Sequence, residues 1–330
     1  MNWQAVGYYI LTDVPIQALI WALFALGVFV TYRILDVADL AVEGVFPLSA
    51  ITSIFFINLG VDPLISLLIA ILVGVLVGFI NGVLHIYLKI PSLLSGIIIM
   101  IALYTVNVVI SKGNISIDSG RQTIFSILNQ LVGNRILSQF SILAFIVAVV
   151  FFVVYWFFGT EYGLSLRASG KNKTMSKANG INTHSRYIVG MIIATAFIAL
   201  AGGLWGQVTK ATATDSGKGT IVIGLAIVFL GEIIFGRKLT FKKSLISIVI
   251  GSFIYWLIMD FIYSIPGFNT NYTFLIQAII ITLVVAAPRI KKLLSKFKKK
   301  EPMMESEEAK LWLNLNIYIK ILKQLVLPIL

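Results

Sequence analysis

The sequence predicts an all-α integral membrane protein, a polytopic bundle of about eight to ten spanning helices, some of them broken or re-entrant. Of its 330 residues, 58% are hydrophobic and only 12% are charged, whereas a soluble domain is roughly 25% charged. The mean hydropathy is +0.96. Too few charged side chains remain to cover a water-exposed surface, so the composition excludes a soluble enzyme. The absence of cysteine excludes disulfides, thiolate metal sites and cysteine nucleophiles.

Nine apolar segments approach the roughly 20 residues that a helix needs to cross a bilayer. They are residues 15–32, 45–59, 63–88, 93–110, 140–158, 187–207, 220–235, 244–263 and 272–287. Several are short, and the segment 45–59 is too short to cross alone if it is straight. The first charged residues are Asp13 and Arg33, so the basic region of a cleavable signal is missing and none is expected.

Lysine and arginine gather in three short segments that hold 16 of the 26 basic residues. These segments are 159–186, 236–243 and 288–300. Each is separated from the next by two predicted spans, so all three lie on one side, which the positive-inside rule makes the cytoplasm. The polar stretches 111–139, 208–219 and 264–271 then lie outside, and nine spans place the N-terminus outside and the C-terminus inside. A re-entrant piece near residues 33–46 would change the position of the N-terminus. The net charge of +12 is therefore mainly a topological signal, and no nucleic-acid patch is expected.

The loop 159–186 contains the start and stop signals of a short helix. Asn172 is a suitable N-cap for residues 173–179, and Gly180 is placed as the glycine that closes them. Positive-inside topology explains the charge of the loop but not a capped helix, which suits docking into a groove of a soluble partner. The candidate docking residues are Arg167, Ala168, Gly170, Asn172, Lys173, Met175, Lys177 and Gly180.

Three acids, Asp36, Asp39 and Glu43, lie between the first two apolar segments. We expect Gly44 and Pro47 to break the helix there, with Pro47 in the first turn of the next helix. This is the pattern of a discontinuous helix whose unwound backbone faces a cavity, and a surface loop carrying acids fits equally well. The candidate path residues are Asp39, Glu43, Gly44 and the neighbouring polar residue Asn81.

Gly74, Gly78 and Gly82 recur every four residues in the segment 63–88, so they share one helix face. Such a face permits close approach of another helix. Packing within the subunit is favoured over a direct role in substrate binding.

Two acids, Glu232 and Asp260, fall within apolar segments, near their ends. An acid inside the membrane is a functional hypothesis by default. Both lie close enough to an interface to be snorkelling or paired structural charges, and this structural interpretation is favoured. These two residues would serve a secondary transporter driven by an ion gradient.

Nucleotide hydrolysis and metal chemistry find no support in the sequence. Residues 215–220 resemble a phosphate loop, but Thr212 replaces its first glycine and Gly219 follows Lys218. His85 and His184 are the only histidines and lie about a hundred positions apart. No His or carboxylate cluster inside a span supports an integral-membrane enzyme.

Three blocks of residues, in matching order and spacing, resemble permeases of the ribose/branched-chain amino acid class of ABC importers. The blocks are residues 39–44, residues 78–84 with 89–94, and residues 163–172 with 180–182. Residues 39–47 and 95–107 look closest to the subgroup associated with uptake of tryptophan and other aromatic amino acids. Glu43 departs from the broader family but is shared by this subgroup.

The resemblance implies a type II-like importer permease over residues 1–295, in the cytoplasmic (inner or plasma) membrane of a bacterium. Its partners would be a second permease copy forming a homodimer, two cytoplasmic ATPases that hold ATP and Mg²⁺, and an extracellular or periplasmic solute-binding protein. The loop 159–186 would be the coupling loop, and the chain itself would be no enzyme and bind no cofactor. Asp39 or Glu43 would meet the ammonium of a zwitterionic substrate, and helix termini its carboxylate. A sugar, nucleoside or branched-chain amino acid is the alternative substrate.

Residues 296–330 lie outside this pattern. They comprise a basic and acidic linker followed by an apolar stretch at helical spacing, which indicates an amphipathic helix at the membrane interface. Lys320 and Lys323 argue against a further span.

Overall fold

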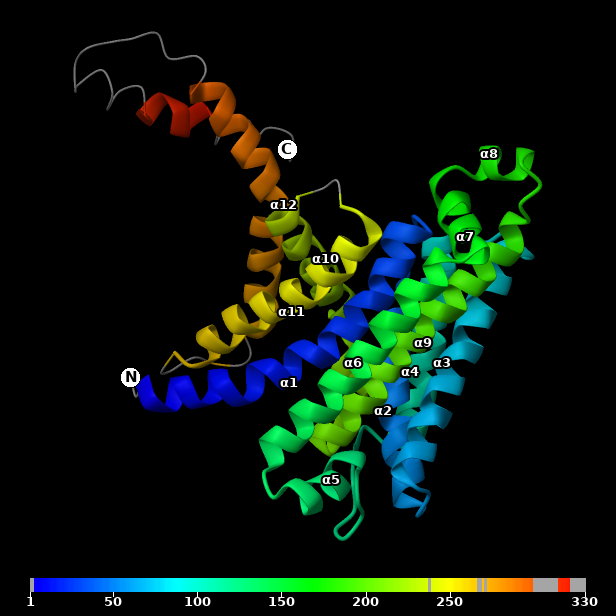
Figure 1. Ribbon diagram of the computed structural model, residues 1–330, viewed down its shortest axis with the longest axis vertical. Helices are drawn as coiled ribbons and strands as arrows, with labels where there is room; N and C mark the ends of the chain where they lie inside the picture. Colours follow the sequence, from blue (N-terminus) through cyan, green and yellow to red (C-terminus); the bar gives the residue numbers. More distant parts are fainter. Residues whose placement is uncertain (1–2, 237–238, 266–268, 270–271, 299–313, 321–330) are drawn as a thin grey trace. The chain divides into compact units, whose positions relative to one another are not determined.

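The computed structural model describes the backbone of residues 3–236, 239–265, 269, 272–298 and 314–320, and most of these residues are helical (Figure 1). The chain divides into two compact units, Met1–Ile281 and Thr282–Leu330. The second unit holds the end of α12 and a helical segment at 314–320. The remainder of the predicted tail helix lies outside the described residues.

Long helices make up most of the chain, and the short helices α5, α7 and α8 lie between them. The helices are α1 Trp3–Phe29, α2 Val42–Asn58, α3 Pro63–Ile86, α4 Ser92–Ser111, α5 Ile124–Val132, α6 Arg135–Gly159, α7 Glu161–Lys171, α8 Lys173–Ala178, α9 Thr183–Thr209, α10 Thr220–Phe235, α11 Phe241–Tyr263 and α12 Thr273–Lys298. A π-helix covers Val30–Ile34, a 3₁₀-helix covers Thr214–Gly217, and the strands are β1 Asn114–Ser116 and β2 Ala211–Ala213.

The prediction of a polytopic helical membrane protein is confirmed. Among the described residues, 7 helices are long and apolar enough to cross a membrane, and Val42–Asn58 and Thr273–Ala286 are shorter apolar helices. Each of the nine predicted segments is therefore helical. The segment that the sequence marked as too short is α2, with 17 residues.

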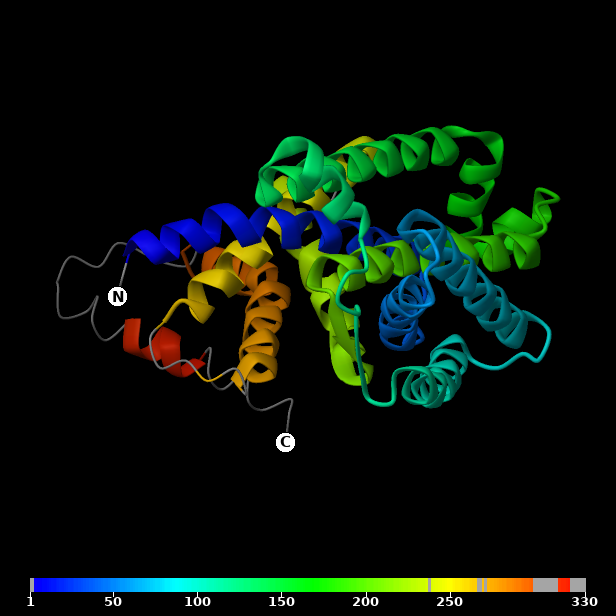
Figure 2. The same ribbon diagram turned by 90° about the horizontal axis from the view of Figure 1, so that it is seen from below.

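Helix α9 is the centre of the first unit and packs against α1, α2 and α3 (Figure 2). Gly74, Gly78 and Gly82 of α3 all face it. A Cβ built on Gly74 or Gly78 would overlap with Ala199 or Thr195, and one on Gly82 would lie 3.1 Å from Ile188. The glycine face thus holds α3 against α9 within one chain.

The two ends of α9 carry different structures (Figure 1). At its C-terminal end, which we call the strand end, β1 and β2 pair antiparallel with Asn114 opposite Ala213. Asn58, at the end of α2, donates a hydrogen bond to the Ser116 carbonyl oxygen at 2.8 Å. The stretches 111–139 and 208–219 therefore meet, as their common predicted side requires. The other end, which we call the α8 end, carries α7 and α8.

The interruption after α1 lies earlier than the sequence suggested. The π-helix ends at Ile34, the chain unwinds over residues 35–41, and α2 begins at Val42. Gly44 and Pro47 therefore lie inside α2, and the prediction that they break the helix is wrong. Pro47 cannot donate to the Glu43 carbonyl oxygen. Gly217 packs against that oxygen and against the proline ring, where a Cβ would overlap with both.

Candidate functional site

A cavity of about 210 Å³ opens between α2, α4 and the 3₁₀-helix before α10. Its walls are mostly apolar, with one carboxylate, one ammonium, one phenol and one amide. The lining residues are Glu43, Gly44, Met100, Ile101, Tyr104, Asn107, Thr214 and Lys218.

Glu43 is held at the N-terminus of α10. Its Oε1 accepts a hydrogen bond from the backbone N–H of Gly219 at 3.1 Å, and Gly219 is the N-cap of α10 with a φ of +75°. The partial positive charge of a helix N-terminus stabilises a carboxylate there. Lys218 pairs with Asp215 at 2.8 Å. The cavity is therefore lined by one acidic side chain, Glu43, and one basic side chain, Lys218, which is paired with Asp215.

The α4 wall of the cavity places Tyr104 one turn before Asn107. Asn107 is 1% exposed; its Nδ2 donates to the Gly44 carbonyl oxygen at 3.2 Å. Its Oδ1 is buried and has no hydrogen-bond partner among the described residues. The Tyr104 ring is half exposed, so this wall offers both an aromatic face and an unused acceptor.

Asp39 and Asn81 do not line this cavity but form a separate buried polar cluster. Asp39 Oδ1 accepts from Asn81 Nδ2 at 2.9 Å and from the backbone N–H of Ala41 at 3.0 Å. Ser95 Oγ donates to Asn81 Oδ1 at 2.8 Å. Asp39 Oδ2 is buried without a partner among the described residues. Asp39 lies in the 35–41 link, outside the spanning helices, and burial raises the pKa of its carboxyl to about 6 against the opposing effect of these hydrogen bonds.

The predicted short helix of the loop 159–186 is present as α8. Asn172 caps it, with Oδ1 accepting from the Met175 backbone N–H at 2.9 Å. Gly180 follows it with a φ of +75°. Lys173, Met175 and Lys177 all stand on the surface. The helix thus projects side chains outward from the α8 end of the protein.

The preceding helix, α7, joins α8 to the body of the protein. It begins at the N-cap Thr160. A Cβ built on Gly170 would overlap with the Ile34 carbonyl oxygen. Arg167 places its guanidinium 4.7 Å from the Phe241 ring centroid, and Ala168 is exposed. α7 therefore rests directly on the end of the π-helix, where the 35–41 link begins.

The two acids in apolar segments have different surroundings. Glu232 receives two hydrogen bonds from Arg33, one from Nε to Oε1 at 2.6 Å and one from Nη2 to Oε2. This bidentate pair is structural in form. Asp260 has a buried Oδ2 without a partner among the described residues. Within the described part of the chain, no group of three His, Asp or Glu side chains is placed to hold a metal ion.

Sequence reasoning missed Tyr104, Asn107 and Lys218 as cavity residues. A signal for two of them exists, because Tyr104 and Asn107 are three residues apart and so share a face of the segment 93–110. An asparagine inside an apolar segment is itself a marker of a specific contact. Lys218 had no such signal, since its approach to α2 depends on the tertiary fold.

Comparison with known proteins completes the description of the site. The family model described as the permease component of branched-chain amino acid transport systems matches residues 10–285. The tyrosine transport system permease protein of Clostridioides difficile (strain R20291) is 34% identical over 275 residues, covering 83% of this chain and 90% of that one. An uncharacterized protein of Rickettsia prowazekii (strain Madrid E) is 28% identical over 220 residues, covering 66% of this chain and 75% of that one. No solved structure matches significantly.

Proposed function

This chain belongs to the permease components of branched-chain amino acid transport systems, an ABC-type family, and we propose that it is the membrane-spanning subunit of an ATP-driven importer of an aromatic amino acid. As a family member it is a multi-pass membrane protein and a transport subunit, not an enzyme. A permease component of such a system works with an ATPase and a solute-binding protein. In this proposal the chain binds no cofactor, and ATP and Mg²⁺ are held by the partner ATPase. It resides in the bacterial cytoplasmic membrane with its C-terminus in the cytoplasm.

The observation that carries the substrate proposal is the cavity between α2 and α4. An aromatic amino acid has an ammonium, a carboxylate and an apolar ring. Glu43 suits the ammonium, Lys218 suits the carboxylate, and Tyr104 with the apolar α4 wall suits the ring. The name of the Clostridioides difficile relative, which specifies tyrosine, supports the same substrate class.

The size of the cavity supports a second permease copy. Pockets that enclose a small molecule have roughly 300 Å³ or more, whereas this cavity has about 210 Å³. The Tyr104 ring is also half exposed on α4, and much of that helix is unburied in the single chain. One copy thus supplies part of a path, and the facing surface of a second copy supplies the rest.

Coupling to ATP hydrolysis would run through α8 and α7. In this proposal α8 seats in a groove of the ATPase, as its caps and exposed side chains suit. Movement of α8 passes to α7, then through the Gly170–Ile34 contact to the 35–41 link and to Glu43 in α2. Alternating access follows as the cavity is exposed first to the binding protein at the strand end and then to the cytoplasm.

The proposal is tested by reconstituting the permease in liposomes with its ATPase and binding protein and following radiolabelled tyrosine and tryptophan. The expected result is ATP-dependent uptake that excess unlabelled tyrosine suppresses and that leucine, ribose and nucleosides do not. Uptake by the permease alone under a proton or sodium gradient would establish a secondary transporter instead. ATP-dependent uptake of leucine or ribose but not tyrosine would retain the importer and reject the aromatic substrate.

A further inference from the structure

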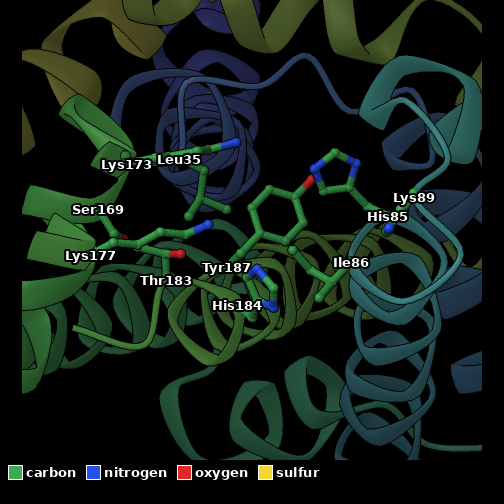
Figure 3. A pocket seen from close by; sticks show the side chains of 11 residues that line it. Leu35, His85, Ile86, Lys89, Ser169, Lys173, Lys177, Thr183, His184 and Tyr187 are labelled. Carbon is green, nitrogen blue, oxygen red and sulfur yellow. The ribbon is translucent and has the colours of Figure 1, made fainter. Parts of the chain in front are cut away.

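A second cavity, of about 320 Å³, lies at the α8 end of the protein between α3, α7, α8 and α9. Three lysines and two histidines line it, and no aspartate or glutamate does. Figure 3 shows Lys173 and Lys177 on one side and His85 and Lys89 on the other, with Tyr187 between them. The cavity therefore gathers positive charge from three separate segments of the chain.

Tyr187 forms the floor of this cavity, and its ring contacts His85 and Lys173. It is 5% exposed; its ring centroid lies 4.6 Å from that of His85 and 5.8 Å from Lys173 Nζ. His85 Nδ1 lies 2.7 Å from the Ile90 carbonyl oxygen. Because a carbonyl oxygen only accepts, Nδ1 is the donor in this hydrogen bond.

The first turn of α9 also faces the cavity. Thr183 is 6% exposed, and it is one of the residues that line the cavity. It is also the first residue of α9, a helix of 27 residues. Asn182 Oδ1 accepts a hydrogen bond from the Ser185 N–H, and the first N–H groups of the helix carry partial positive charge.

We propose that this cavity binds a phosphate group, supplied either by an anionic phospholipid headgroup or by a soluble phosphate. Three ammonium groups with no carboxylate in the lining, the Thr183 hydroxyl and the start of a long helix are the chemistry that recognises phosphate. A concave site of this volume suits a compact anion better than the surface of a protein partner. Bound phosphate bridges Lys89, which follows α3, to Lys173 and Lys177, and so fixes α8 to the membrane-embedded body.

The test compares two double variants of the full chain with equal loss of charge. Lys89→Gln/Lys177→Gln alters the cavity, and Lys242→Gln/Lys243→Gln alters exposed lysines that do not line it. Unfolding of the purified protein in detergent is followed while phosphatidylglycerol or phosphatidylcholine is added. A parallel series adds inorganic phosphate, with chloride at equal ionic strength as its control.

The wild type is expected to show saturable stabilisation by phosphatidylglycerol or by inorganic phosphate. A lysine near an anionic surface contributes roughly a fivefold gain in affinity, so the cavity variant should bind about thirtyfold more weakly. The control variant should stay within about threefold of the wild type. Stabilisation by phosphatidylglycerol alone identifies the lipid as the source, and stabilisation by inorganic phosphate as well identifies a free phosphate.

A variant that merely misfolds is recognised with Lys89→Arg, which keeps the charge and should bind as the wild type does. The absence of saturable stabilisation in the wild type would overturn the proposal, as would equal losses in both double variants. The proposal also fails if the cavity variant binds phosphate normally but no longer binds the ATPase, because the lysines would then serve a protein contact.

Discussion

Gly170 of α7 lies directly against the backbone carbonyl of Ile34, the last residue of the π-helix, with no space for a side chain between them. This contact joins the α7–α8 loop to the link that leads into α2. Since Glu43 stands in the first turn of α2, few residues separate the loop from the cavity.

Gly170→Val is expected to displace α7 and uncouple ATP hydrolysis from uptake. The added side chain would overlap backbone, which cannot move aside cheaply, and overpacking of this kind costs about 1–3 kcal/mol. ATPase activity and uptake measured in the reconstituted complex check this. The matched control is Gly159→Ala, where a Cβ meets nothing within 4 Å. Tightly coupled uptake by Gly170→Val would contradict the mechanical link.

Asp39 is expected to make folding stability pH-dependent. Burial raises the pKa of its carboxyl from 3.8 to about 6, so the folded state holds the proton more tightly. Its stabilising contribution is complete below about pH 4 and is lost as the pH rises through about 6, by on the order of 3 kcal/mol. Asp39→Asn should flatten the curve of unfolding midpoint against pH between 4 and 7. Asp36→Asn, on the exposed part of the same link, should retain the wild-type curve.

Glu43→Gln is expected to impair uptake with little effect on folding. The glutamine keeps an oxygen that accepts from the Gly219 N–H, which Glu43 does at 3.1 Å, but it removes the charge that faces a substrate ammonium. The loss corresponds to about 1.5–3 kcal/mol, the range for a hydrogen bond to a charged group. Concentration dependence of tyrosine uptake measures it, with Asp118→Asn at the strand end as control. An unchanged apparent affinity for tyrosine would show that Glu43 does not bind the substrate.

Tyr104 is expected to contribute through its ring rather than its hydroxyl. Tyr104→Phe should keep uptake of aromatic substrates near the wild-type level, whereas Tyr104→Ala should lower it because about 0.5–1.5 kcal/mol of ring contact is lost. Uptake of labelled tyrosine and of labelled tryptophan by each variant gives the readout. Equal loss in both variants would indicate that the phenol group, and not the ring, is used.

The Arg33–Glu232 pair is expected to support folding and not ion coupling. Its side chains are 39% and 13% exposed, so the cost of removing one partner lies between that of surface and buried pairs, at about 1–3 kcal/mol. Thermal unfolding should show that Glu232→Gln is less stable than the wild type. The loss of stability in Arg33→Gln/Glu232→Gln should be smaller than the sum of the losses in the two single variants. Loss of uptake in Glu232→Gln without loss of stability would revive a role in transport.

Local signals explain which predictions the structure confirmed. The caps of α8 depend on Asn172 and Gly180, which are within a few residues of the helix, and apolar runs of sufficient length define the spans. By contrast, Pro47 lies inside α2, and Gly217, distant in sequence, packs against the proline ring and the Glu43 carbonyl. No local rule contains that information.

The site shows the same division between local and tertiary information. Asp39 and Glu43 are four residues apart, and both were predicted to line the substrate path. Asp39 lies in the unwound link and Glu43 lies in α2, so the two side chains contact different helices. Asp39 meets Asn81, and Glu43 meets Gly219. Their separation depends on helices α3 and α10, whose positions a single sequence does not specify.

The pairing of β1 with β2 also constrains how the protein is made. The ribosome completes β2 about a hundred residues after β1, with α6 and α9 between them. The β1–β2 pair at the strand end therefore cannot form until both of these helices have been inserted. Until then β1 remains an unpaired strand edge. A nascent chain halted after α6 would contain its early spans but not the β1–β2 pair. Pairing of β2 with β1 is therefore a late step in biogenesis.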